Sequence, residues 1–156
     1  MNIRIEKATT NDIDALVEMR LEYLLADYGS LSDDQLTKIK SSLPDYYQKH
    51  LGIDLLVYVA RADKIVSCSF LLITEKPSNP SFINGRTGTV LNVYTKPAYR
   101  KQGLARKLME QLIADANELE LNYIELKSTD DGYPLYQSLG FRETETRYRS
   151  MKLVIQ

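Results

Sequence analysis

The stretch from Arg100 to Arg106 combines residue types at a spacing that could hold a phosphate group. A run of β-formers, residues 87–95, precedes it, and an amphipathic helical run, residues 104–121, follows. The first N–H groups of a helix have no partner within it, and the helix dipole is positive there, so an anion is stabilised at that end. Gly103 would let the anion approach the backbone closely. This segment therefore predicts a site for a phosphate-bearing ligand.

Basic side chains crowd the predicted start of this helix, where acidic residues are usually preferred. They are Arg100, Lys101, Arg106 and Lys107. A bound polyanion would stabilise this arrangement, and the alternative is a set of solvated surface charges. The nucleotide-binding patterns G-x-x-x-x-G-K-[ST] and G-x-G-x-x-G do not occur in the sequence, which disfavours a nucleotide-binding protein.

A tyrosine near the end of the chain is a candidate proton donor. It lies in residues 134–141, Pro-Leu-Tyr-Gln-Ser-Leu-Gly-Phe. A phenol has a reference pKa of about 10, so Tyr136 is protonated at neutral pH and could donate a proton. The alternative is an amphipathic core tyrosine, one of eleven tyrosines in the chain.

These segments resemble two signatures of the GNAT (Gcn5-related N-acetyltransferase) superfamily. Arg100, Gly103 and Ala105 fill the three defined positions of its acetyl-CoA-binding motif, Q/R-x-x-G-x-G/A. Residues 93–99 look like the end of the family's strand four, and residues 134–141 resemble its late LYxxLGF signature. The resemblance extends more loosely from about residue 3 to residue 153, and it implies an N-acetyltransferase that uses acetyl-CoA.

The resemblance also implies a fold: a mixed α/β (α+β) domain over residues 1–156, with a central, mostly antiparallel sheet of six or seven strands flanked by helices. Strands four and five would be parallel neighbours that splay apart and hold the pantetheine arm. Pro44 is expected to divide the second helical region into two short helices. The patterns predict strands at residues 3–7, 54–61, 65–74, 87–95, 123–127, 141–146 and 148–155, and helices at residues 13–29, 32–51, 104–121 and 134–139.

Roles for individual residues follow from the resemblance. Backbone groups of Val93 and Thr95 would pair with pantetheine, and a main-chain N–H near Tyr94 would polarise the thioester carbonyl. Tyr136 would be the general acid. Thr129 stands where many relatives carry an asparagine, and it could still hydrogen-bond the cofactor. The expected cofactor contacts are Val93, Tyr94, Thr95, Arg100, Lys101, Gln102, Gly103, Leu104, Ala105, Arg106 and Thr129.

The general base cannot be assigned from the sequence. Many relatives place a glutamate on strand four, but Asn92 lies in that region and an amide cannot take a proton. A water chain or a substrate that arrives unprotonated would suffice, and Glu125 and Asp130 are possible stand-ins, although exposed carboxylates usually serve only solvation. The missing asparagine and glutamate keep open a second function, a non-catalytic acyl-CoA-binding or regulatory module. The resemblance implies that the acceptor, an amine of a small molecule or a peptide, lies against residues 23–51 and 75–86.

The composition of the chain disfavours several kinds of partner and site. The chain has 156 residues, enough for one domain, and a formal net charge of −1, which gives no electrostatic case for a nucleic-acid or membrane partner. The only cysteine, Cys68, lies in a predicted strand, where a small buried residue is favoured over a reactive thiol. One cysteine and one histidine make a metal site improbable. We expect a cytoplasmic protein, since no apolar run suits a signal peptide or a membrane span, and a homodimer is a common outcome for such a fold.

Overall fold

A single mixed sheet runs through the centre of the computed structural model, which describes residues 2–156, so that Met1 lies outside the described residues. The strand order is β1-β2-β3-β4-β5; the first three junctions are antiparallel, and β4 and β5 are parallel. The strands are β1 Arg4–Lys7, β2 Leu55–Arg61, β3 Ile65–Glu75, β4 Arg86–Thr95 and β5 Ile124–Glu125. The expected mixed α/β fold, with a mostly antiparallel sheet and parallel strands four and five, is confirmed.

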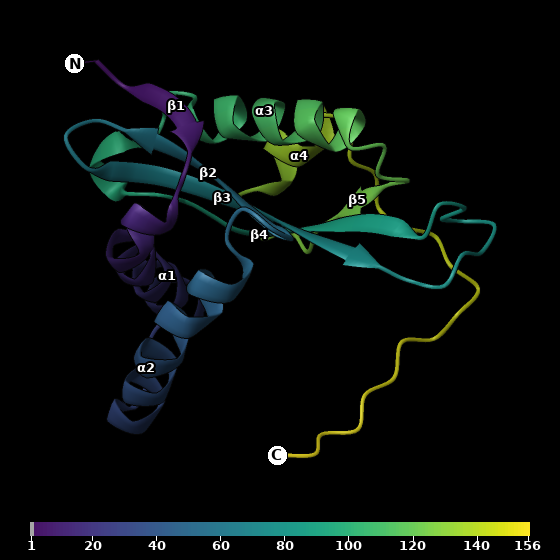
Figure 1. Cartoon of the computed structure of the whole chain (residues 1–156), viewed down its shortest axis with the longest axis horizontal. Helices are drawn as coiled ribbons and strands as arrows, with labels where there is room; N and C mark the ends of the chain where they lie inside the picture. The colour runs from purple at the N-terminus through teal and green to yellow at the C-terminus, as the bar shows by residue number, and fades with distance from the viewer. Residues whose placement is uncertain (1) are drawn as a thin grey trace.

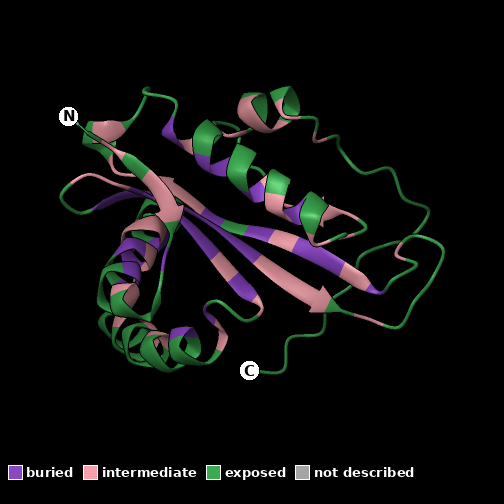
Figure 2. Ribbon diagram, turned by 45° about the horizontal axis from the view of Figure 1, so that its top comes forward, coloured by how far each residue is buried: buried purple, intermediate pink, exposed green. Residues whose placement is uncertain are grey.

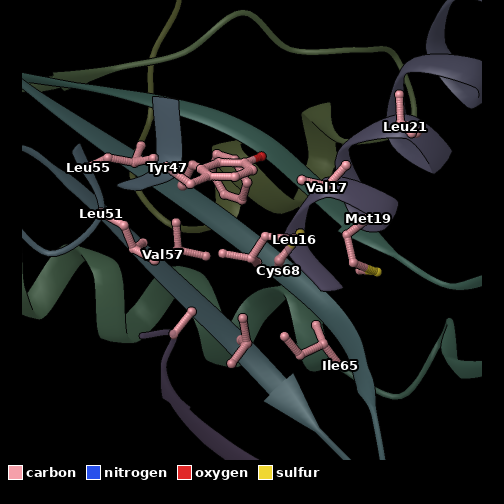
Figure 3. Packing of buried hydrophobic residues seen from close by; sticks show 13 residues of the cluster. Leu16, Val17, Met19, Leu21, Tyr47, Leu51, Leu55, Val57, Ile65 and Cys68 are labelled. Atoms are coloured by element: carbon pink, nitrogen blue, oxygen red, sulfur yellow. The ribbon is translucent and has the colours of Figure 1, made fainter. Parts of the chain in front are cut away.

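Helices cover both faces of the sheet (Figure 1). They are α1 Ile13–Tyr28, α2 Asp33–His50, α3 Leu104–Glu118 and α4 Tyr133–Ser138. Because successive side chains of a strand point to opposite faces, Val57 and Val59 of β2 pack with α1 and α2, whereas Tyr58 and Ala60 pack with α3. The central strands are therefore buried on both sides (Figure 2), and Figure 3 shows the first of these two cores.

The predicted break of the second helical region at Pro44 is wrong, because α2 runs through this residue without interruption. Pro44 has no N–H to donate within the helix. In the turns before it, the Ser41 hydroxyl donates to the carbonyl of Lys38 (3.0 Å) and the Ser42 hydroxyl to that of Ile39 (2.9 Å). The helix also packs its apolar side, including the buried Tyr47, on the first core. Packing thus outweighs the loss of one backbone hydrogen bond.

The two strands predicted at residues 141–146 and 148–155 are also wrong. No strand is assigned after β5 in the described part of the chain, so the sheet has five strands rather than six or seven. A strand needs a neighbour for its backbone as well as β-forming side chains. The last residues run away from the sheet (Figure 1), and Met151 and Leu153 are 92% and 82% exposed.

A β-bulge at Asn92 interrupts the regular pairing of β4 with β3. The register with β3 shifts between Cys68, opposite Tyr94, and Phe70, opposite Leu91, so β4 carries one extra residue there. Asn92 has a φ of 53°, a left-handed conformation that asparagine tolerates better than most residues. A bulge bends its strand. Pairing of β4 with β5 joins Gly88 to Ile124 and Thr89 to Glu125, and β5 ends there.

Candidate active site

The turn that leads into α3 presents unpaired backbone donors. Lys101 and Gly103 both have positive φ angles, 62° and 76°, and α3 begins at Leu104 with no acidic residue in its first turn. After the turn, the first backbone N–H group that is hydrogen-bonded is that of Lys107, which donates to the carbonyl of Gly103 (3.2 Å). No acceptor in residues 2–156 hydrogen-bonds the N–H groups of residues 101–106. The turn therefore has the geometry of an anion-binding helix start.

A cavity of about 600 Å³ opens on this turn. Ten of the eleven residues expected to contact a cofactor line it, and so does Tyr136. Gln102, the remaining one, is exposed and does not line the cavity. It occupies an undefined position of the motif, where the side chain type carries no information. The lining residues predicted from the sequence are Val93, Tyr94, Thr95, Arg100, Lys101, Gly103, Leu104, Ala105, Arg106 and Thr129.

Arg100 and Arg106 line the cavity, and most of their contacts within the protein are with neutral groups. Arg100 Nε donates to the carbonyl of Thr95 (2.9 Å), and its guanidinium lies 5.7 Å from the Tyr94 ring centroid. Arg106 donates to the hydroxyl of Ser138 and lies 3.8 Å from a carboxylate oxygen of Glu110. Each guanidinium has five N–H donors, so these contacts leave donors for a phosphate.

Tyr136 lies on α4 and lines the same cavity as the turn. The Thr129 hydroxyl accepts a hydrogen bond from Gly132 N–H (3.2 Å), and this bond closes the turn that starts the helix. Burial raises the pKa of Tyr136 to about 12, and the nearby Tyr23 adds to the shift. The ring packs edge-on against Phe141, with 5.9 Å between centroids. The phenol is consequently protonated at neutral pH and can donate a proton.

A second cavity, of about 690 Å³, lies next to the first. It is lined by α1, by β4 from Thr89 to Val93 and by residues 125–129, whereas α2 and residues 75–86, where we expected the acceptor side to extend, do not line it. The residues that line both cavities are Tyr23, Asp27, Val93, Thr129 and Tyr136. These five residues mark where the two cavities meet.

Asp27 is the only carboxylate among the residues shared by the two cavities. It lies four residues after Tyr23 on α1, so both side chains are on one helix face. Of the two stand-ins considered for a base, Glu125 lines the second cavity only, and Asp130 lines neither. Nothing in residue type alone distinguishes Asp27 from the other acidic residues of the first two helices. The spacing from Tyr23 was the one signal that could have singled it out.

Asn92 serves the structure rather than proton transfer. Its side chain is buried, donates from Nδ2 to Cys68 Sγ (3.3 Å) and accepts at Oδ1 from Arg20 Nη1 (3.1 Å). Cys68 is fully buried, and its burial raises the pKa of the thiol to about 12. A neutral, inaccessible thiol is not a nucleophile. The prediction that Cys68 is a small buried residue is confirmed.

The bulged β4, the parallel β5 and the anion-binding start of α3 are the features that define the acetyltransferase fold class. The chain belongs to the GNAT family, because the family model described as the acetyltransferase (GNAT) domain matches residues 43–143. A search of curated protein sequences found no match.

Several solved structures are similar along the whole chain. One is a predicted acetyltransferase with acetyl-CoA from Clostridium acetobutylicum, 25% identical, with 97% of this chain and 96% of that chain covered and a TM-score of 0.84. Another is a GCN5-related N-acetyltransferase from Ralstonia eutropha, which is 20% identical, with 96% of this chain and 99% of that chain covered and a TM-score of 0.79. A third is glucosamine-6-phosphate N-acetyltransferase from Arabidopsis thaliana, which is 18% identical, with 97% of this chain and 99% of that chain covered and a TM-score of 0.65. The second and third, at their low identity, show a shared fold.

Two further properties concern the described residues as a whole. None of the helices within residues 2–156 combines the length and apolar character needed to cross a membrane. In the same residues, no three His, Cys, Asp or Glu side chains come together in a group that could hold a metal ion.

Proposed function

We propose that the protein is an N-acetyltransferase that moves an acetyl group from acetyl-CoA to a primary amine of a small molecule or a peptide. One observation carries this proposal: a cavity at an anion-binding turn meets a second cavity at a tyrosine that can donate a proton. Two adjoining cavities suit two substrates, and the shared wall is where their reacting atoms would meet. We propose that it works in the cytosol.

The first cavity suits the cofactor. Its pyrophosphate would accept hydrogen bonds from the free N–H groups of residues 101–106, with Arg100 and Arg106 adding charge. A hydrogen bond to a charged group contributes about 1.5–3 kcal/mol. The pantetheine arm would extend along Val93 and Thr95 into the opening between β4 and β5. The thioester would then lie near Tyr94 and Tyr136.

The reaction would be a direct attack of the amine on the thioester. The acceptor in the second cavity loses a proton to Asp27, directly or through a water, and the amine nitrogen bonds to the acetyl carbon. A backbone N–H near Tyr94 stabilises the oxyanion. The bond from carbon to sulfur then breaks, the Tyr136 hydroxyl gives its proton to the thiolate, and the resulting phenolate regains a proton from the nitrogen as the amide forms. No covalent enzyme intermediate is needed, in keeping with the buried, neutral Cys68.

Asp27→Asn tests the assignment of the base. The amide keeps the size of the side chain but cannot take a proton, so kcat should fall by about 10²-fold at neutral pH, a typical acid–base contribution. Without a base only the unprotonated amine reacts, so the deficit should shrink as the pH approaches the pKa of the amine. Steady-state kinetics across this pH range measures both effects.

The matched control is Asp131→Asn, because Asp131 lines the cofactor cavity but not the acceptor cavity. This variant should keep the neutral-pH kcat. If Asp27→Asn behaves like Asp131→Asn, Asp27 is not the base, and water or the solvent takes the proton.

Gly132→Ala tests whether the position of Tyr136 matters apart from its hydroxyl. A Cβ atom at Gly132 would lie 2.8 Å from Cε2 of the Tyr136 ring, so the ring must shift, while the φ angle of −81° suits alanine. A misplacement of this kind can lower kcat by about 10²-fold. Gln137→Ala, an exposed site on the same helix, is the control and should leave kcat unchanged. Equal kcat values for the two variants would show that the ring tolerates displacement.

A thiol-release assay with a panel of amines, run beside calorimetry with acetyl-CoA, tests the function itself. An amine acetyltransferase should bind acetyl-CoA and release thiol faster when a suitable amine is present. The second candidate, a non-catalytic acyl-CoA-binding or regulatory module, is favoured by the departures at Asn92 and Thr129. It predicts binding without any amine-stimulated release.

A further inference from the structure

Arg20 is a basic residue on the core-facing side of α1. Its neighbours three and four positions away along the helix include the buried Leu16, Val17 and Leu24, and the first two belong to the first core (Figure 3). Arginine is mostly an exposed residue, and on a buried face it usually has a partner of opposite charge. The packing of α1 therefore does not explain an arginine at this position.

The polar contacts of Arg20 within the described chain are with neutral groups. Its Nη1 donates to the amide oxygen of Asn92 (3.1 Å), and its guanidinium lies 5.7 Å from the centroid of the Tyr23 ring. A guanidinium has five N–H donors in a planar fork, and the hydrogen bond to Asn92 engages one of them. The remaining donors suit the oxygens of a carboxylate or a phosphate.

The acidic residues nearest to Arg20 in the sequence are paired with other cations. A carboxylate oxygen of Glu18 lies 3.7 Å from the Lys40 ammonium. Glu22 forms an ion pair with Lys96 at 2.9 Å. No salt bridge joins Arg20 to any carboxylate in residues 2–156. The described chain thus supplies no counter-charge for this guanidinium.

Arg20 faces the second cavity, the candidate acceptor site. It lines this cavity with Tyr23 and Asp27 of the same helix, and it does not line the cofactor cavity. Asp27, the proposed base, is seven residues further on, which is about 10 Å along a helix axis. The other charged lining residues, Glu125 and Lys127, have opposite charges and add no net charge. The cavity therefore offers a negative group for the amine and, two helical turns away, a positive group without a partner.

We propose that the acceptor amine also carries an anionic group, a carboxylate or a phosphate, and that Arg20 binds it. This inference rests on the proposed function, because it names the substrate class of the same site. The amine would lie at Asp27, and the anion would lie at the guanidinium that Asn92 orients. An arginine that only supports the bulge at Asn92 is the alternative, and the two roles predict different kinetics.

Matched pairs of acceptors separate these roles. Each pair is an ω-amino acid and its terminal amide, from β-alanine to 6-aminohexanoate, and an ω-aminoalkyl phosphate of each length compares phosphate with carboxylate. In the thiol-release assay, the anionic member of the best-fitting pair should have a kcat/KM roughly 10–100-fold higher, the gain from a hydrogen bond to a charged group. Equal values in every pair, or a preference for the amides, would overturn the proposal.

Arg20→Gln removes the charge but keeps an N–H donor for Asn92. It should lower kcat/KM for the anionic acceptor roughly 10–100-fold more than for its amide, whereas a structural arginine predicts equal losses. The matched control is Lys96→Gln, because Lys96 is also a partly buried cation but pairs with Glu22 and lines neither cavity. The control should keep the preference for the anion. A preference that survives in Arg20→Gln contradicts the assignment.

Calorimetry on the protein saturated with CoA distinguishes failure of this inference from failure of the proposed function. The acetylated acid, 6-acetamidohexanoate, should bind more tightly than 6-acetamidohexanamide, and Arg20→Gln should remove the difference. If binding follows this pattern but no amine is acetylated, the proposed function is wrong while Arg20 still binds an anion. If amines are acetylated and neither assay shows a preference for the anion, the proposed function stands and this inference is wrong. If no amine is acetylated and the two compounds bind alike, both are wrong.

Discussion

Gly103→Glu should abolish acetyl-CoA binding while the protein remains folded. No atom lies within 4 Å of the position that a Cβ at Gly103 would take, so the new side chain meets open space where the pyrophosphate would lie. Its carboxylate would repel the phosphates and block the free N–H groups of the turn. Losing two charge-assisted hydrogen bonds corresponds to about 3–6 kcal/mol, or roughly 10²–10⁴-fold in Kd.

The control for this variant is Gly52→Glu. Gly52 has a φ of 80°, close to the 76° of Gly103, and equally open surroundings, but it lies between α2 and β2, outside the lining of the cofactor cavity. A left-handed conformation costs a residue other than glycine about 1–2 kcal/mol, so the two variants should lose similar stability. Calorimetry should find normal acetyl-CoA affinity only in Gly52→Glu. Undiminished affinity in Gly103→Glu would mean that the turn does not hold the phosphates.

Tyr136→Phe should lower kcat by roughly 10²-fold with little change in cofactor affinity, if proton donation limits the rate. The ring and its edge-on contact with Phe141 remain, and only the hydroxyl is removed. An unchanged kcat with a higher cofactor KM would make Tyr136 a binding residue, with the sulfur leaving as the thiolate or taking its proton from water.

The pH dependence gives a separate test of the same role. A general acid works only while protonated, and burial raises the pKa of Tyr136 to about 12. Loss of this proton should therefore not lower the wild-type kcat between pH 7 and pH 10. A decline with an apparent pKa below about 10, absent from Tyr136→Phe, would show that the phenol titrates much lower than its burial implies.

Local patterns predicted the cofactor side of the site well. The turn at Gly103 and the start of α3 depend on a few consecutive residues, and both are in the structure as expected from the sequence. The helix that carries Tyr136 also depends on short-range signals, including Gly140 after its end. Ten of eleven expected contact residues therefore reach one cavity, although no sequence pattern distinguishes the exposed Gln102 from its neighbours.

Features that depend on distant residues could not be predicted. The position of Asp27 between two cavities depends on how α1 packs on β4. The structural role of Asn92 depends on Cys68 and Arg20, which come from β3 and α1. Residues 148–155 have the side chains of a strand, but a strand also needs a paired neighbour, and no strand pairs with these residues in the described structure.

Transfer of an isotope-labelled acetyl group most directly tests the central claim that the protein acetylates an amine. Acetyl-CoA labelled in its acetyl carbons would be incubated with the wild-type protein and an amine from the thiol-release panel, and the products would be analysed by mass spectrometry. The proposed function predicts a labelled N-acetyl product that accumulates in step with free CoA, is strongly reduced with Tyr136→Phe and is absent with Gly103→Glu. Label found only in free acetate, although calorimetry shows that acetyl-CoA binds, would contradict it.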